Sequence, residues 1–203
     1  MTLTEIEKIA DKILAEAGIK NPAIMSDRIA EFIFDLEFDW KYLKNNSIQS
    51  EILATISFKD KKIYMNKAQE YELKNNPGRL NFTIAHELGH WVLHKDLAQE
   101  KLEIFEGEIL ICRGIDRLTD NKERQANLFA TYLLMPEKFV REEFKNFTFD
   151  QNIVRQMAER FCVSKQAMEI RLVNELKLAY KLKNKFYRNK SEAFEAAGQQ
   201  KLF

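Results

Sequence analysis

Residues 84–94 read IAHELGHWVLH and place two histidines, His86 and His90, four positions apart. On a helix, residues four apart share a face and lie roughly 6 Å from each other along the axis, so two imidazoles can bind one metal ion. Glu87 projects beside them, where its carboxylate can take a proton from a metal-bound water. The chain has three histidines, and all of them lie between positions 86 and 94. The pattern predicts a catalytic zinc site on a helix.

A catalytic zinc ion is usually held by three protein groups, so a third ligand is needed. His94 is the obvious candidate, but it lies eight residues after His86, about 12 Å further along the helix. An ion that sits about 2.0–2.1 Å from each nitrogen cannot reach both. We therefore expect His94 to lie at the end of the helix or to support a ligand from behind.

The third ligand should come from a second helix that crosses the first. Residues 121–135 read NKERQANLFATYLLM and form the only well-patterned helix downstream, with Glu123 near its start. Asn127 follows one turn later, where its amide can hydrogen-bond a liganding histidine. Spacing alone leaves other acids open as the ligand: Glu100, Glu103, Glu106, Glu108, Asp116 and Asp120.

Upstream of the motif, the sequence predicts two helices followed by a small sheet. Thr4 and Glu7 resemble a capping box for a helix that stops at Gly18. A second helix begins near Pro22, and alternating aromatic residues then suggest a strand at 38–42. Residues 51–66, EILATISFKDKKIYMN, read as a hairpin with its turn at 59–62. The second helix is expected to bury Ile29, Phe32, Ile33 and Leu36.

Composition narrows the class of protein. With 203 residues and 45% hydrophobic content, the chain suits one domain or one domain with a small appendage. A net charge of +1 excludes a polycation built to coat nucleic acid, so any role in nucleic-acid binding must be local.

Cys112 and Cys162 lack metal-ligand spacing and are expected to be reduced thiols. No signal peptide and no apolar run of roughly 20 residues is found, which predicts a cytoplasmic protein without a membrane span.

The two motifs together, IAHELGHWVLH and then ERQANLFATYLLMP, resemble the ImmA/IrrE family of zinc metallopeptidases over roughly residues 50 to 175. The resemblance implies that Glu123 is the third zinc ligand. It also implies an α+β, zincin-like fold of the gluzincin type, with a small mixed or antiparallel sheet over the active-site helix. The resemblance further implies that the protein cleaves a helix-turn-helix transcriptional repressor. It implies a mobile-element, stress-response or phage-defence context for this cleavage.

Zincins commonly bind substrate by strand addition to a sheet edge beside the cleft. The strand at 62–66 is the expected edge, which makes Ile63, Tyr64, Met65 and Asn66 candidate substrate-binding residues; the alternative is a purely structural hairpin. A donor for the oxyanion is also expected. The sequence does not rank Tyr64, Tyr132 and His94 for that role.

Residues 153–172, IVRQMAERFCVSKQAMEIRL, resemble a helix-turn-helix with its turn at Val163-Ser164. Cys162 stands where that motif usually has glycine, and Arg171 where it usually has an aliphatic residue. Structural support of the peptidase is the favoured interpretation, and contact with double- or single-stranded DNA is the alternative. The expected organisation is a peptidase domain at 1–147, this helical segment at 148–180 and a basic, flexible tail at 181–203.

The last residues, with Gln199, Leu202 and Phe203, resemble the Gln-x-x-Leu-Phe peptide that docks on the bacterial sliding clamp. The leading functional hypothesis is a zinc-dependent endopeptidase that acts on a specific protein. The alternative is a DNA-binding regulator with a zinc site and little proteolytic activity. Glu87 favours the enzyme, because a structural zinc site does not need a general base and usually fills all four positions with protein ligands.

Overall fold

The computed structural model describes residues 1–43, 52–102 and 117–197, and for 96–102 and 117–120 it describes the backbone only. Residues 103–112, EIFEGEILIC, whose sequence is compatible with one more strand, lie outside these ranges. So do the acids Glu103, Glu106, Glu108 and Asp116 and the terminal Gln199, Leu202 and Phe203. So do the side chains of Glu100, Cys112 and Asp120. None of the helices in the described ranges combines the length and the apolar composition that a bilayer crossing requires.

Two amphipathic helices open the chain. Helix α1 (Leu3–Glu16) begins at a capping box in which the Thr2 hydroxyl accepts from Glu5 N and the Glu5 carboxylate accepts from Thr2 N. The box therefore lies two residues before the expected Thr4–Glu7 pair. Helix α2 (Ser26–Phe34) begins later than expected and buries Ser26, Ile29 and Ala30. Two of the expected core residues, Phe32 and Ile33, are 73% and 36% exposed, so this short helix buries a narrower face than expected.

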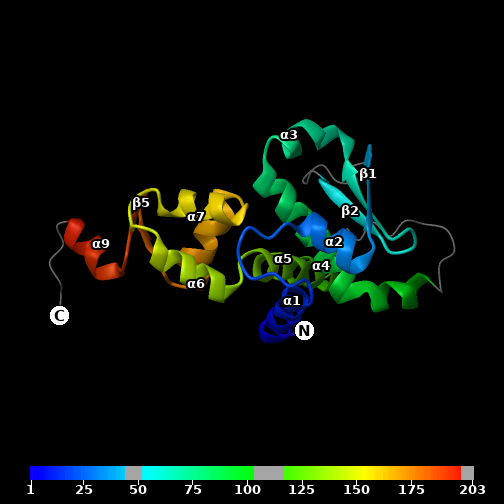
Figure 1. Ribbon diagram of the computed structural model, residues 1–203, viewed down its shortest axis with the longest axis horizontal. Coiled ribbons are helices and arrows are strands. Elements are labelled where there is room, and N and C mark those ends of the chain that lie inside the picture. The colour runs from blue at the N-terminus through cyan, green and yellow to red at the C-terminus, as the bar shows by residue number, and fades with distance from the viewer. Residues whose placement is uncertain (44–51, 103–116, 198–203) are drawn as a thin grey trace.

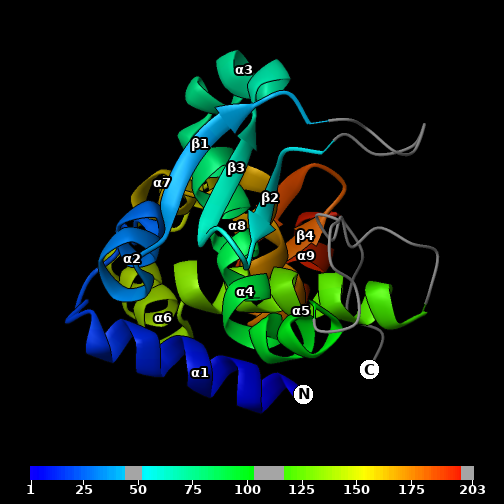
Figure 2. The ribbon, with the colours of Figure 1, turned by 90° about the vertical axis from the view of Figure 1, so that its right-hand side faces the viewer.

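A three-stranded mixed sheet follows, made of β1 (Glu37–Lys41), β2 (Ala54–Ser57) and β3 (Lys62–Asn66). The predicted hairpin is confirmed, since β2 and β3 pair antiparallel with Ile56 opposite Ile63. Strand β1 pairs in parallel with the other side of β3, so the order is β1-β3-β2 (Figure 2).

The sheet order corrects the expectation that 62–66 is an edge strand. Strand β3 lies between two partners, so its backbone is already paired on both sides and cannot accept a substrate strand. Ile63 and Met65 are buried in the core, and the Asn66 side chain donates to Ile52 O at 2.7 Å. Tyr64 points to the other face, where its hydroxyl donates to Asp60.

The helices that form the centre of the molecule come next. A short 3-10 turn (Lys67–Gln69) and α3 (Glu70–Lys74) lead into α4 (Pro77–Leu102), which carries the histidines. Helix α5 (Arg117–Leu134) packs across α4, and α6 (Glu137–Asn146) follows the break at Pro136. Because α4 continues to Leu102, His94 lies inside the helix and not at its end.

The C-terminal part contains more order than the sequence predicts. Helix α7 (Ile153–Phe161) and α8 (Lys165–Glu169) flank the turn at 162–164, and a π-helical stretch, η2 (Ile170–Glu175), extends α8. Strands β4 (Tyr180–Leu182) and β5 (Lys185–Tyr187) form a hairpin, and α9 (Lys190–Ala196) packs on it. A flexible tail was expected from 181 onwards, but residues 180–196 form these regular elements. Figure 1 shows this hairpin and α9 at one end of the molecule and the mixed sheet at the other.

The turn between α7 and α8 is bound to the start of α4. At Gly78, an added Cβ would lie 2.5 Å from the Val163 carbonyl carbon. The buried Asn81 donates to both Cys162 O and Ile24 O and accepts from Ser26 N. One hydrophobic core runs from α1 to the C-terminal hairpin. The helix that carries the histidines is therefore packed directly against the segment at 153–172.

The substitution Gly78→Ala should destabilise the fold, because the new methyl group meets backbone that cannot move aside as a side chain can. We expect a loss of about 1–3 kcal/mol in the free energy of unfolding, measured by urea denaturation. Gly18→Asn is the control: Gly18 has positive φ and open space around it, and Asn tolerates that conformation. Equal stability of Gly78→Ala and the parent protein would contradict the close contact.

Candidate metal centre

The site depends on how closely α4 and α5 approach each other. A Cβ built at Gly89 would lie 3.0 Å from Ala126 Cα and 3.1 Å from Ala126 O, so the two backbones are almost in contact here. Ala126 is fully buried and presents only a methyl group. Glu123 lies three residues before Ala126, on the turn that faces the histidines. The two small residues bring a side chain of α5 within reach of α4.

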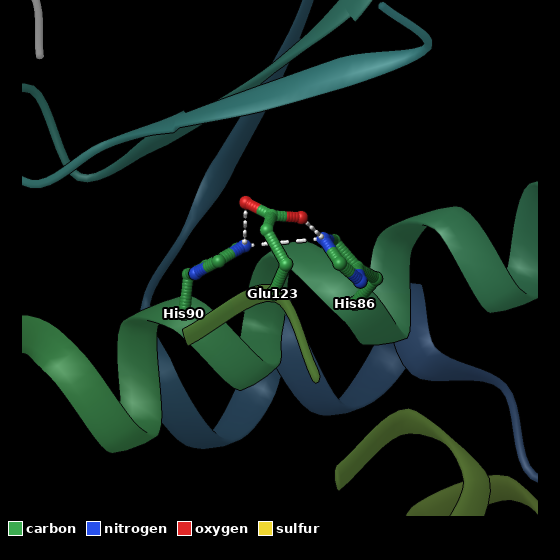
Figure 3. A group of neighbouring side chains, drawn as sticks. All are labelled: His86, His90 and Glu123. Carbon is green, nitrogen blue, oxygen red and sulfur yellow. Dashed lines mark hydrogen bonds and ion pairs between the residues drawn. The ribbon is translucent and has the colours of Figure 1, made fainter. Parts of the chain in front are cut away.

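Three side chains converge at this crossing (Figure 3). His86 Nε2 lies 3.2 Å from Glu123 Oε2, and His90 Nε2 lies 3.3 Å from Glu123 Oε1. The two Nε2 atoms are 3.1 Å apart. Around a tetrahedral ion with bonds of about 2.0–2.1 Å, neighbouring ligand atoms lie about 3.3–3.4 Å from each other. The separations therefore suit three ligands of one metal ion.

The hydrogen bond of Asn127 sets the tautomer of His86. Asn127 Oδ1 lies 3.0 Å from His86 Nδ1, and a carboxamide oxygen only accepts, so Nδ1 carries the proton. His86 Nε2 then has a free lone pair, which faces a carboxylate oxygen that is also an electron-pair donor. A cation between these lone pairs would bind both. The donor set therefore fits a divalent metal ion.

The electrostatics favour the metal-binding form of Glu123. Burial raises the pKa of this carboxyl group, but the imidazoles of His86 and His90 beside it outweigh burial and hold the pKa well below its usual value. Burial lowers the pKa of His86, whereas the carboxylates of Glu123 and Glu87 raise it, and the net shift is upwards. Glu123 is thus an anion at neutral pH, as a metal ligand must be.

Glu87 is a buried carboxylate next to the first ligand, with only 7% of its surface exposed. Its charge acts directly on the His86 ring, which places it in the electrostatic environment of the site. It does not belong to the group of three converging ligand atoms. A buried carboxylate beside a candidate metal site is placed where proton transfer to or from a metal-bound water would occur.

His94 supports the site from one turn further along α4. Its ring centroid lies 5.6 Å from that of His90, and its Nε2 lies 3.4 Å from Lys122 O, next to Glu123. Burial lowers the pKa of His94 to about 4, so its ring is neutral at physiological pH. The structure thus places His94 behind the ligands and outside the ligand group, as helix geometry predicts.

The two candidate tyrosines lie elsewhere. The Tyr64 hydroxyl donates to Asp60 on the outer face of the sheet. Tyr132 follows Glu123 by nine residues, about 13.5 Å along α5, and its ring lies under the Arg171 guanidinium. Of the three candidates for the oxyanion donor, only His94 borders a metal ligand.

A shallow hollow of about 390 Å³ adjoins the site and was not predicted. The hollow follows the exposed face of α5. Its lining residues on this helix recur every three to four positions, so the sequence did contain a signal that they share one face. Glu175 comes from a distant segment that carries no such signal. The lining residues are Glu123, Arg124, Asn127, Leu128, Thr131 and Glu175.

Within the described residues, His86, His90 and Glu123 are the one group of three potential metal ligands. Two helical imidazoles, a carboxylate from a crossing helix and a neighbouring buried glutamate are the constellation of a metallopeptidase, the class of protein to which the fold and the site point.

Comparison with known proteins identifies the family. Residues 72–173, half of the chain, match the model of the IrrE N-terminal-like domain, peptidase family M78. The chain therefore belongs to this family. The match spans both helices of the site and the α7–α8 turn.

Two relatives agree with this placement. Over 70 residues, the chain is 37% identical to the metallopeptidase ImmA of Bacillus subtilis (strain 168), covering 34% of this chain and 36% of ImmA. A Mycobacterium tuberculosis transcriptional regulator shares the fold with a TM-score of 0.52 at 16% identity, over 83% of this chain and 46% of that protein. Each match spans less than half of the relative's own length.

Replacing Glu123 by Ala should remove a ligand and lower bound metal well below one equivalent per chain, measured by elemental analysis after dialysis. Arg124→Ala is the matched control, because Arg124 lines the hollow next to Glu123 and is not in the ligand group. Unchanged metal content in Glu123→Ala would exclude Glu123 as the third ligand.

Asn127→Ala should weaken metal binding while leaving all three ligands in place. Loss of the acceptor at His86 Nδ1 frees the tautomer and the orientation of the ring. Such supporting partners typically contribute about 10–100-fold in affinity, so we expect a drop of that size in competition with a chromogenic chelator. An affinity within twofold of the parent protein would mean that the hydrogen bond does not orient His86.

Proposed function

We propose that the protein is a zinc-dependent endopeptidase that hydrolyses a peptide bond in a specific protein substrate. The observation that carries the proposal is the buried Glu87 beside a group of three ligands. Three protein ligands leave a fourth position for water, whereas structural zinc sites are usually closed by four protein ligands. Two imidazoles with one carboxylate are also a donor set that zinc accepts.

Each residue then has a distinct task. His86, His90 and Glu123 hold the ion, and Asn127 keeps the His86 lone pair directed at it. A bound zinc ion would supply an acidified water and polarise the scissile carbonyl. Glu87 accepts the proton of that water and delivers it to the leaving amine. His94, neutral and buried next to His90, keeps the ligand helices in place.

The substrate strand is better assigned to β2 than to β3. Among the described strands, β2 is paired only with β3, and it packs against α4. An extended peptide can therefore add to β2 by main-chain hydrogen bonds, with specificity from alternate side chains. The hollow along α5 would receive side chains of the substrate on the other side of the metal centre.

We propose a helix-turn-helix transcriptional repressor as the substrate, in a mobile-element, stress-response or phage-defence context. The support is the family resemblance of the two motifs, not a feature of the cleft. Such a substrate would place the reaction in the cytoplasm. A DNA-binding regulator with little proteolytic activity is the competing function, and it does not call for a general base beside the metal ligands.

The decisive experiment incubates the zinc-loaded protein with a helix-turn-helix repressor from the same genome, chosen first from the genes next to its own. We expect cleavage by the parent protein and a loss of about 10²–10⁴-fold in the cleavage rate with Glu87→Gln, since this is the usual contribution of a general base. Zinc content should be unchanged in that variant, because Glu87 is not a ligand.

Glu31→Gln, at an exposed position on α2, is the matched control and should cleave at the parent rate. Single-stranded DNA is added in a parallel reaction as a possible activator. Equal survival of the repressor with parent protein and Glu87→Gln, in both reactions, would refute proteolysis of that partner.

A further inference from the structure

Positive charge is concentrated in the C-terminal hairpin. Between positions 177 and 190 the chain carries six basic residues and no acid, although the whole molecule has a net charge of only +1. These residues are Lys177, Lys181, Lys183, Lys185, Arg188 and Lys190. The proposed peptidase chemistry does not use any of them. A local excess of this kind creates a potential that attracts polyanions.

The hairpin is a fixed scaffold. The Gln151 side chain donates to Phe186 O and accepts from Phe186 N, both at 2.8 Å, and so binds β5 as a neighbouring strand would. Phe186 is buried, and α9 packs on both strands. Lys183 takes positive φ in the two-residue turn between the strands. The basic side chains thus project from an ordered backbone, so little backbone conformational entropy is lost when a ligand binds.

Most of this charge is not neutralised within the molecule. Lys181 is the exception: it pairs with Glu169 at 2.6 Å and lies over the Phe186 ring. Lys183 and Lys185 are exposed, and no described carboxylate lies within ion-pair distance of either. Lys177 and Arg188 are exposed on the flanks of the same hairpin. The tip and its flanks therefore present four cations to solvent.

We propose that the β4–β5 hairpin binds the phosphate backbone of double-stranded DNA, with Lys183 and Lys185 at the tip and Lys177 and Arg188 beside them. A two-stranded ribbon fits the major groove, and lysine and arginine are the usual phosphate partners. Binding through phosphates is independent of base sequence. The proposal does not depend on peptidase activity.

The surface around the tip favours nucleic acid over a membrane. A protein segment that lies in a membrane interface needs exposed apolar side chains to enter the acyl region. None of the exposed large hydrophobic residues in the described chain lies between 177 and 190. The hairpin also lies at the end of the molecule away from the mixed sheet (Figure 1), so DNA at this end leaves the sheet side of the metal centre open.

The test measures fluorescence anisotropy of two labelled 20-base-pair duplexes of unrelated sequence, titrated with the full chain between 50 and 200 mM KCl. The parent protein should bind both with similar Kd. With four phosphate contacts, log K should fall against log[KCl] with a slope of about −3.6. Binding should be the same with EDTA, because the hairpin carries no metal ligand, and this separates its outcome from that of the peptidase test.

The variant K183E/K185E should weaken binding at least about tenfold at 50 mM KCl and reduce the slope by about 2. K8E/K20E is the matched control, with the same change in net charge at exposed lysines in the N-terminal part, and it should stay within twofold of the parent protein. K183Q/K185Q removes the two charges without introducing repulsion and should show the same change in slope.

Three results would overturn the proposal. One is the absence of DNA binding by the parent protein at 10 µM and 50 mM KCl. Another is an equal loss of affinity in K8E/K20E and K183E/K185E. The third is binding of phosphatidylserine vesicles without binding of either duplex, which would assign the surface to a membrane. Thermal unfolding of all variants, followed by circular dichroism, checks that the hairpin substitutions leave the fold intact.

Discussion

The close approach of α4 and α5 at Gly89 and Ala126 is the constraint on which the metal centre depends. A glutamate side chain is short, and Glu123 reaches both imidazoles only because the two backbones are almost in contact one turn away. A larger residue at Gly89 would separate the helices and take Glu123 and Asn127 away from α4 together. Gly89, which lies between the two histidines in the sequence, is therefore as important to the site as His86 and His90.

Helix α5 joins the metal centre to the C-terminal segment. Its middle part carries Glu123 and Asn127, and its C-terminal end is held by Arg171, which donates to Met135 O and lies over the Tyr132 ring. Arg171 is almost fully buried and pairs with Glu175 at 2.7 Å, at the far end of the hollow. The segment at 153–175 thus braces the helix that carries Glu123, the candidate third ligand, which favours a structural role for the α7–α8 unit. Arg171 stands where a helix-turn-helix usually has an aliphatic residue, and its contacts with Met135 O and Glu175 give this departure a structural reason.

The sequence predicted what depends on local spacing. Two histidines one turn apart and the period of 121–135 indicate helices, and a polar turn between β-rich flanks indicates a hairpin. Pairing between distant segments was not predictable in the same way. Strand β3 is central because it has a parallel partner, β1, some 25 residues earlier in the chain. The C-terminal hairpin is well ordered because Gln151, 35 residues before Phe186, binds its second strand. Neither contact leaves a periodic signal near the strand that it stabilises.

The small net charge conceals a separation of charge that matters for function. At the metal centre, three half-buried lone-pair donors and the buried Glu87 beside them form an electron-rich group suited to one divalent ion. The tip of the β4–β5 hairpin presents Lys183 and Lys185, which no described carboxylate neutralises. Opposite charges at separate places nearly cancel in a sum over the chain, yet each acts over a Debye length of about 8–10 Å on its own surroundings. The net charge therefore excludes a general coating of nucleic acid, whereas a local DNA contact beside a peptidase centre remains physically consistent with it.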